Sequence, residues 1–197
     1  MLGILSKLKI TLKKPKTIIV CGSSRLVAKK AINQVLKPYL KINSEVFVFD
    51  NDFSNLPELD FLMKNSSLLI LVIASSGAKT EEKKTIEKIR KLVKTAPLGG
   101  YLVFNSDDKA FGEVAELTNL KTLTFGFEEG ANFQASDIHS NGGTNFKLNY
   151  KGNIVPFWLQ DKSGGEQVCA VLASACVGVI FDLNLVEISE ALRNFGA

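Results

Sequence analysis

Apolar residues along the chain fall into two patterns, short continuous runs and runs with helical spacing. The continuous runs predict strands at 17–21, 45–50, 67–74, 100–104 and 122–126. Between them, apolar residues three or four positions apart predict helices at 24–40, 57–64 and 80–94, the last capped by Thr80, and a helix from Asp107 onward. Strands that alternate with helices predict an α/β fold, in which a mostly parallel sheet carries helices on both faces.

The pattern changes after Gly126. Three short alternating segments, "ANFQASDIHS", "TNFKLNY" and "NIVPFWLQ", are separated by glycine-containing turns. They predict a small antiparallel β lobe at about 127–160. Two final helices are expected at 165–181 and 185–195, the second capped by Asn184. We expect a basic leader at 1–16 and one domain at 17–197.

Composition narrows the class of protein. The 197 residues are 46% hydrophobic, which suits one domain with a sizeable core. The longest apolar run, 68–74, is too short for a membrane span of about 20 residues. Three cysteines lie inside apolar runs and predict free thiols in a reducing compartment, so we expect a cytoplasmic protein.

Histidine and cysteine usage argues against two kinds of chemistry. His139 is the only histidine, and no Cys/His cluster has the spacing of a metal site. Nucleophilic catalysis by a Ser–His or Cys–His pair is therefore not expected. His139 and Trp158 are interpreted as structural residues.

Charge is unevenly distributed. Residues 1–40 carry nine Lys or Arg and no acid, whereas the other residues carry fifteen basic and twenty acidic side chains. This basic segment is either a solvated face or a surface for anionic lipid, nucleic acid or an acidic partner. Self-association is left open by the sequence.

The stretch "TIIVCGSSRLVAKK" has the frame of a phosphate-binding loop: a strand, a glycine turn and a helix. Such loops bind phosphate through backbone N–H groups, with a lysine on the phosphates and a Ser or Thr hydroxyl on Mg²⁺. Here the turn has small residues, but the positions of the second glycine, the lysine and the hydroxyl hold other side chains: Gly22, Ser23 and Ser24, then Arg25, Leu26 and Val27. The stretch is either a plain strand-to-helix turn or a site where Arg25, Lys29 or Lys30 supplies the charge.

A second candidate segment is "LVFNSDDKAF". Asn105 ends a predicted strand, and Ser106 is expected to cap the next helix, with Asp107 and Asp108 favouring its dipole. The carboxyl edge of a parallel sheet is where ligands bind in such folds. Asn105 and Asp108 are therefore candidate binding residues.

The order of these parts resembles the central ATP-binding domain of the Mur ligase family, the ATP-dependent amino-acid and peptide ligases of peptidoglycan synthesis. The branch that adds D-Ala-D-Ala is the most similar. The resemblance covers nearly all of 15–197 and rests on five segments in order: "PKTIIVCGSS", "GGYLVFNSDD", "KTLTFGFEEGANFQASDI", "GTNFKLNYKGNIVPFWLQ" and "GGEQVCAVLASACVGVIFDLNLVEISEALRNF". It implies a fold like that of the P-loop nucleotide triphosphatases.

The chain also departs from the family pattern. The phosphate loop lacks its Gly, Lys and Thr, and the Mg²⁺-binding Glu expected after "LLILV" is missing from 72–76. The stretch that carries a metal-binding His is replaced by 79–94, and the Gly-x-His position holds Gln167. We expect a stand-alone domain without the family's other two domains.

By resemblance, Asn105 contacts adenine, flanked by Asp107 and Asp108. Because the lysine of the phosphate loop and the Mg²⁺-binding residues are missing, we expect no catalytic residue, no metal ligand and no required cofactor. Binding of ATP, ADP or adenosine is expected to be weak, at a vestigial site formed by Gly22, Ser23, Ser24, Arg25, Asn105 and Asp108.

The function we expect is that of a non-catalytic binding or scaffold protein, a pseudoenzyme that associates with cell-wall synthesis proteins. One alternative is an ATP-dependent ligase-type enzyme with a non-standard phosphate loop. Another is an adaptor that uses residues 1–40 to bind nucleic acid or attach peripherally to a membrane.

Overall fold

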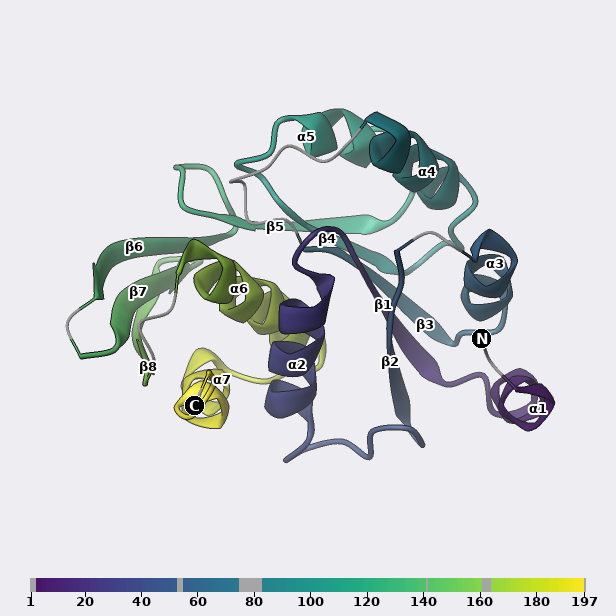
Figure 1. Ribbon diagram of the computed structural model, residues 1–197, viewed down its shortest axis with the longest axis horizontal. Coiled ribbons are helices and arrows are strands. Elements are labelled where there is room, and N and C mark those ends of the chain that lie inside the picture. The colour runs from purple at the N-terminus through teal and green to yellow at the C-terminus, as the bar shows by residue number, and fades with distance from the viewer. Residues whose placement is uncertain (1–2, 53–54, 75–82, 141, 161–163, 197) are drawn as a thin grey trace.

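An eight-stranded sheet of order β2-β1-β3-β4-β5-β6-β7-β8 runs through the computed structural model, which describes residues 3–52, 55–74, 83–140, 142–160 and 164–196 (Figure 1). Its strands are β1 (Lys16–Cys21), β2 (Val46–Asp50), β3 (Leu68–Ile73), β4 (Tyr101–Asn105), β5 (Lys121–Gly126), β6 (Phe133–Ser140), β7 (Thr144–Tyr150) and β8 (Asn153–Leu159). The helices are α1 (Ile4–Lys13), α2 (Arg25–Leu36), α3 (Leu56–Lys64), α4 (Lys83–Lys94), α5 (Ala110–Ala115), α6 (Gly165–Ile180) and α7 (Leu185–Leu192).

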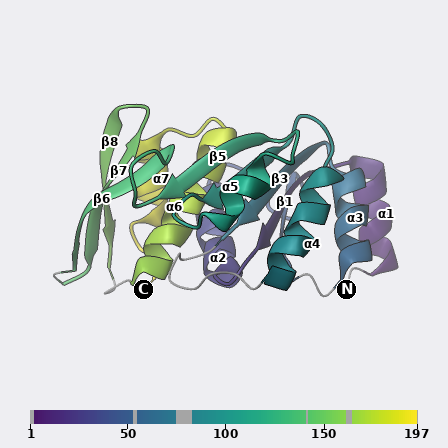
Figure 2. The same cartoon turned by 90° about the horizontal axis from the view of Figure 1, so that it is seen from above.

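The sheet separates two layers of helices (Figures 1 and 2). Helices α2, α6 and α7 pack on one face, and α1, α3, α4 and α5 pack on the other, each layer with its own hydrophobic cluster. Both faces of β1 and β3 are therefore buried, which explains their continuous apolar sequences. The predicted α/β fold with helices on both faces is confirmed.

Strands β1 to β5 pair in parallel, as predicted. Strand β6 pairs in parallel with β5 over only two positions, Phe125 with Phe133 and Gly126 with Gln134. Strands β6, β7 and β8 are antiparallel to one another. The expected antiparallel strands are thus present, and they continue the same sheet instead of forming a separate layer.

Helix α1 lies where a basic leader was expected. Its Ile10 is fully buried in the cluster that also holds residues of α3 and α4, whereas Leu8 and Leu12 are 56% and 76% exposed. The helix is therefore docked on the sheet's second layer through one side. The division of the chain after residue 16 stays a prediction.

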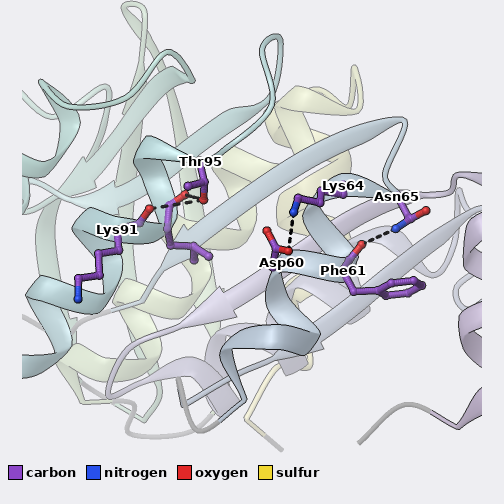
Figure 3. A network of polar contacts seen from close by, with 7 residues as sticks. Asp60, Phe61, Lys64, Asn65, Lys91 and Thr95 are labelled. Atoms are coloured by element: carbon purple, nitrogen blue, oxygen red, sulfur yellow. Dashed lines mark hydrogen bonds and ion pairs between the residues drawn. The ribbon is translucent and has the colours of Figure 1, made fainter.

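Side chains close the C-terminal ends of α3 and α4 (Figure 3). Asn65 donates from Nδ2 to the Phe61 carbonyl at 2.8 Å, and Lys64 pairs with Asp60 at 2.7 Å. Thr95 Oγ1 donates to the Leu92 carbonyl at 3.1 Å. The Asn65 and Thr95 side chains thus bond to carbonyls in the last helical turns, whereas Lys64 and Asp60 form an ion pair along α3. The predicted cap of α4, Thr80, lies outside the described residues.

The helix predicted from Asp107 begins instead at Ala110, and Ser106 is not its N-cap. The Ser106 hydroxyl donates to the Phe125 carbonyl at 3.3 Å, so it serves the neighbouring strand. The Asp107 carboxylate also turns toward that strand, where it accepts hydrogen bonds from two backbone N–H groups. Ser106 and Asp107 therefore bond to β5 and the residues that follow it, and they do not cap α5.

Helix α6 is buried from Val168 to Gly178, between α2 and the sheet. Its apolar residues surround it on all sides because both neighbours are apolar.

Within the described part of the chain, no helix is long and apolar enough to cross a membrane.

Candidate functional site

The two segments singled out in the sequence end at the same edge of the sheet. Cys21 of β1 pairs with Ile73 of β3, and Ile73 pairs with Phe104 of β4. Gly22 and Asn105 therefore lie at the carboxyl edge, two strands or roughly 10 Å apart. Because β1 lies between β2 and β3, the ends of β1 and β3 form the switch point where ligands bind in open α/β sheets.

Backbone hydrogen bonds hold the turn between β1 and α2 to the end of β3. The Ser24 N–H donates to the Ala74 carbonyl at 3.0 Å, and the Ala74 N–H donates to the Cys21 carbonyl at 2.8 Å. The Arg25 N–H donates to the Gly22 carbonyl at 3.3 Å. Two amides that would face a phosphate in a phosphate-binding loop thus have partners within the protein.

Gly22 is required by this turn for two reasons. Its φ is +99°, a conformation that residues with a Cβ rarely adopt. A Cβ at this position would also lie 2.4 Å from the Ala74 carbonyl oxygen. The predicted glycine turn therefore has a structural explanation that involves no ligand.

Arg25 folds back over the turn. Its guanidinium donates from Nη1 to the Gly22 carbonyl at 3.4 Å. Its buried Nε has no hydrogen-bond partner among the described residues. Leu26, at the position of the family's lysine, is 55% exposed.

Lys29 forms an ion pair with Asp50, a residue that was not predicted from the sequence to belong to the site. Its ammonium pairs with the Asp50 carboxylate at 2.5 Å, and both side chains are about one third exposed, at 33% and 30%. The hydrogen bond from Lys29 holds the pKa of Asp50 below its ordinary value, although burial acts in the opposite direction. The sequence feature that could have revealed this pair is the acid Asp50 at the end of β2, the strand that pairs with β1.

Asn105 lies in the interior. It is 0% exposed, its Oδ1 accepts a hydrogen bond from the Asp107 N–H at 2.9 Å, and its Nδ2 lies 3.8 Å from Cys169 Sγ. Asp108 is 9% exposed, and one of its oxygens accepts from the Ala110 N–H at 3.2 Å. Its other oxygen is buried without a partner among the described residues. The adenine contact of Asn105 stays a prediction.

Asp107 connects the ends of β4 and β5. Its carboxylate accepts hydrogen bonds from the N–H groups of Phe127 at 2.9 Å and Glu128 at 3.1 Å. A Cβ on Gly126 would lie 2.4 Å from this carboxylate, so glycine permits the approach. The acid is used to hold the sheet edge together.

Cys169, on α6, lies beside Asn105 but is not a nucleophile at neutral pH. Burial raises the pKa of its thiol to about 12, and the negative charges of Asp107 and Glu166 add to the effect. Cysteine reacts as the thiolate, which this thiol does not form near pH 7.

The structure describes only part of the expected metal region. Ser75 and Ser76, which follow the strand where the family's Glu is expected, lie outside the described residues. Gln167 lies half-buried in the first turn of α6. Within the described ranges, no group of three His, Cys, Asp or Glu side chains could hold a metal ion. The expectation of no metal site stays a prediction.

Comparison with known proteins finds relatives among cell-wall ligases, although no family model matches the chain. The UDP-N-acetylmuramate–L-alanine ligase of Clostridium beijerinckii is 36% identical over 100 residues, which make up 50% of this chain and 22% of the ligase. The same enzyme of Hydrogenobaculum sp. is 30% identical over 110 residues, or 55% of this chain and 24% of that ligase.

Solved structures show the same fold at low sequence identity. MurF from Acinetobacter baumannii has a TM-score of 0.81 and 15% identity, over 98% of this chain and 48% of that one. The MurF ligase from Thermotoga maritima in complex with ADP has a TM-score of 0.76 and 18% identity, over 94% and 50%.

The chain thus spans about half the length of these solved ligases, and its sequence matches cover about a quarter of the curated ones. The solved structures include a D-alanyl-D-alanyl ligase, whereas the curated relatives are L-alanine ligases, so the expected D-Ala-D-Ala branch stays a prediction. The chain therefore has the fold of these Mur ligases, and about half of it is similar in sequence to UDP-N-acetylmuramate–L-alanine ligases.

Proposed function

We propose that this protein is a non-catalytic binding or scaffold protein of cell-wall metabolism, and that its ATP and Mg²⁺ site has been lost. The observation that carries the proposal is the hydrogen bond from the Ser24 N–H to the Ala74 carbonyl, at the crevice where a phosphate would be bound. Leu26 and Val27 stand where the resemblance places the lysine and the Mg²⁺-binding hydroxyl. In this proposal the protein works in the cytoplasm beside cell-wall synthesis proteins.

The energies of the missing contacts predict a large loss of triphosphate affinity. A hydrogen bond to a charged group contributes about 1.5–3 kcal/mol, and each 1.4 kcal/mol is roughly tenfold in affinity. Losing the lysine and the hydroxyl ligand together thus weakens binding by about 10² to 10⁴. Lys29 does not replace the lysine, because Asp50 already neutralises it. Weak binding of ADP or adenosine is what this proposal retains.

Isothermal titration of the protein with ATP and Mg²⁺, and separately with ADP and adenosine, tests the proposal. We expect no saturation by ATP at micromolar concentrations and no phosphate release in a parallel hydrolysis assay. Micromolar ATP binding or steady hydrolysis would overturn it.

A restored loop tests the assigned cause. The triple variant Arg25→Gly, Leu26→Lys, Val27→Thr rebuilds the family's loop residues, and Arg25→Gly alone is the matched control. We expect the triple variant to bind ATP with Mg²⁺ at least tenfold more tightly than the control. Equal affinities would show that these positions are not what removed binding.

The alternative of a ligase-type enzyme with a non-standard loop makes the opposite prediction. It requires ATP turnover that Arg25→Ala and Lys29→Ala each abolish. The pairing of Lys29 with Asp50 favours the non-catalytic proposal, since a lysine held by an acid is a poor phosphate ligand. Turnover assays with cell-wall precursors separate the two.

A second candidate function is attachment to an anionic surface. Leu8 and Leu12 are exposed one helical turn apart on α1, within the segment 1–40 that carries nine basic residues and no acid. Exposed leucines beside lysines favour the interface of an anionic bilayer. We expect co-sedimentation with vesicles containing phosphatidylglycerol that high salt and the Leu8→Ser, Leu12→Ser variant both abolish. Binding to DNA in place of the vesicles, or to neither DNA nor vesicles, would count against attachment to a membrane.

A further inference from the structure

A pocket lies at the antiparallel end of the sheet, away from the candidate nucleotide site at the ends of β1 and β3. Its volume is about 490 Å³, within the usual range for small-molecule sites. Strands β6, β7 and β8 and helix α7 contribute its lining, which includes Asp137, Asn145, Lys147, Trp158, Ser189 and Arg193. We call it the tryptophan pocket.

The pairing of β7 with β8 builds the central part of this pocket. Asn145 pairs with Trp158, and Lys147 pairs with Pro156. Because alternate residues of a strand point to the same face, these four side chains share one face of the sheet.

Helix α7 borders the pocket beyond β8. The Ser189 hydroxyl donates a hydrogen bond to the Pro156 carbonyl at 3.0 Å, which ties the helix to the edge strand. Arg193, the C-cap of α7, comes about one helical turn after Ser189, so the two residues lie on the same side of the helix. Its position beside the pocket is thus fixed by the strand and the helix together.

Strand β6 completes the pocket through a bulge. The register of β6 shifts between Ser136 and His139, and Asp137 in the bulge has a φ of +51°. This conformation brings the Asp137 carboxylate to 2.6 Å from the Lys147 ammonium. Bulges commonly re-aim a side chain beside a functional site, and strained residues cluster at such sites.

Several groups at the pocket have no hydrogen-bond partner among the residues that the structure describes. The indole Nε1 of Trp158, the guanidinium of Arg193 and the side-chain amide of Asn145 form no hydrogen bond with another described residue. Trp158 as a whole is 57% exposed. Asp137 neutralises Lys147, so Arg193 leaves the pocket with a net positive charge.

We propose that the tryptophan pocket binds a small molecule in which a flat ring carries an oxyanion, either a carboxylate or a phosphate. The ring packs against the indole of Trp158, which offers a wide apolar face. The oxyanion is bound by Arg193, whose planar guanidinium matches two oxygens at once. Asn145 supplies a donor and an acceptor for other polar groups of the ring.

The protein's single tryptophan makes a direct test possible. In a ¹H–¹⁵N spectrum the only indole N–H signal belongs to Trp158. Phenyl phosphate and phenylacetate are the two oxyanion probes, and benzyl alcohol is the uncharged control. We expect a saturable shift of the indole signal with one or both oxyanions, and at least tenfold weaker binding of the alcohol. Which probe binds more tightly identifies the oxyanion.

Variants separate binding in the pocket from general charge effects. Arg193→Gln is expected to weaken oxyanion binding at least tenfold, whereas Lys109→Gln removes an exposed charge elsewhere and is expected to change nothing. Ligand-observed spectra should show binding kept by Trp158→Phe and lost by Trp158→Ser. An unchanged indole signal with both oxyanions, or equal binding by the Arg193→Gln and Lys109→Gln variants, would refute the proposal.

Discussion

The backbone N–H of Ser24 donates a 3.0 Å hydrogen bond to the carbonyl oxygen of Ala74, across the crevice between the ends of β1 and β3. The contact depends on Gly22, whose left-handed conformation lets the chain turn directly above that carbonyl. The turn therefore joins two strand ends, and α2 starts from this joint. A phosphate at this point would compete with a bond that the fold already uses.

Gly22→Ala is expected to destabilise the protein strongly. The left-handed φ alone costs roughly 1–2 kcal/mol for a residue with a Cβ, and the added methyl would meet the Ala74 oxygen at 2.4 Å. Gly130→Ala is a matched control, because Gly130 has the same φ of +99° but open space around it. Urea unfolding should show a clearly larger loss for Gly22→Ala. Equal losses would mean that the carbonyl contact does not matter.

Much of the fold could be predicted from the sequence because the signal was local. A parallel strand covered on both faces is apolar throughout, as in "SLLILVIA", so β3 was found within a residue or two of its bounds. The Asn184 cap was also predicted, because an Asn with a Glu three residues later satisfies helix amides without help from other segments.

The site could not be predicted to the same degree, because its contacts join distant segments. Lys29 and Asp50 are 21 residues apart, and Asp107 bonds to N–H groups about twenty residues downstream. Asn105, which ends β4, is fully buried beside Cys169, and nothing in the sequence indicated that neighbour on α6. The sequence predicted that the Gly22 turn and Asn105 lie at the carboxyl edge of the sheet, but it gave no sign of the pairing of Lys29 with Asp50 or of the direction in which the Asp107 side chain turns.

Asp50→Asn is expected to lower stability at neutral pH and to have less effect in acid. Since the folded pKa of Asp50 lies below its unfolded value of 3.8, its contribution is complete above about pH 4 and is lost as pH falls through the folded pKa. The pair is about one third exposed, so the loss at pH 7 should be about 0.2–1 kcal/mol. Urea unfolding between pH 2 and 7 should show the two proteins converging. A difference that grows in acid would contradict the pairing.

The three cysteines are expected to resist thiol reagents in the folded protein. Cys21, Cys169 and Cys176 are all buried, so a disulfide-exchange reagent at pH 8 should label none of them until denaturant is added. Burial raises the Cys169 pKa from the usual 9.0 to about 12, so the unfolded chain loses this proton first. Stability should therefore fall as pH rises between these values, and less steeply in Cys169→Ala. Rapid labelling of Cys169 or Cys176 in the native protein would show that α6 opens.

Asn184→Ala is expected to cost about 1 kcal/mol by removing the cap of α7. The Asn184 side chain accepts hydrogen bonds from the N–H groups of Val186 and Glu187, both at 3.0 Å, and Glu187 accepts from the Asn184 N–H at 2.8 Å. Asn184→Asp keeps an accepting oxygen at the positive end of the helix and should keep most of the stability. Because α7 also borders the tryptophan pocket, Asn184→Ala should weaken oxyanion binding there while Asn184→Asp preserves it. Unfolding curves and the indole signal of Trp158 measure the two effects, and a loss of stability without any change in binding would show that the pocket does not depend on how α7 begins.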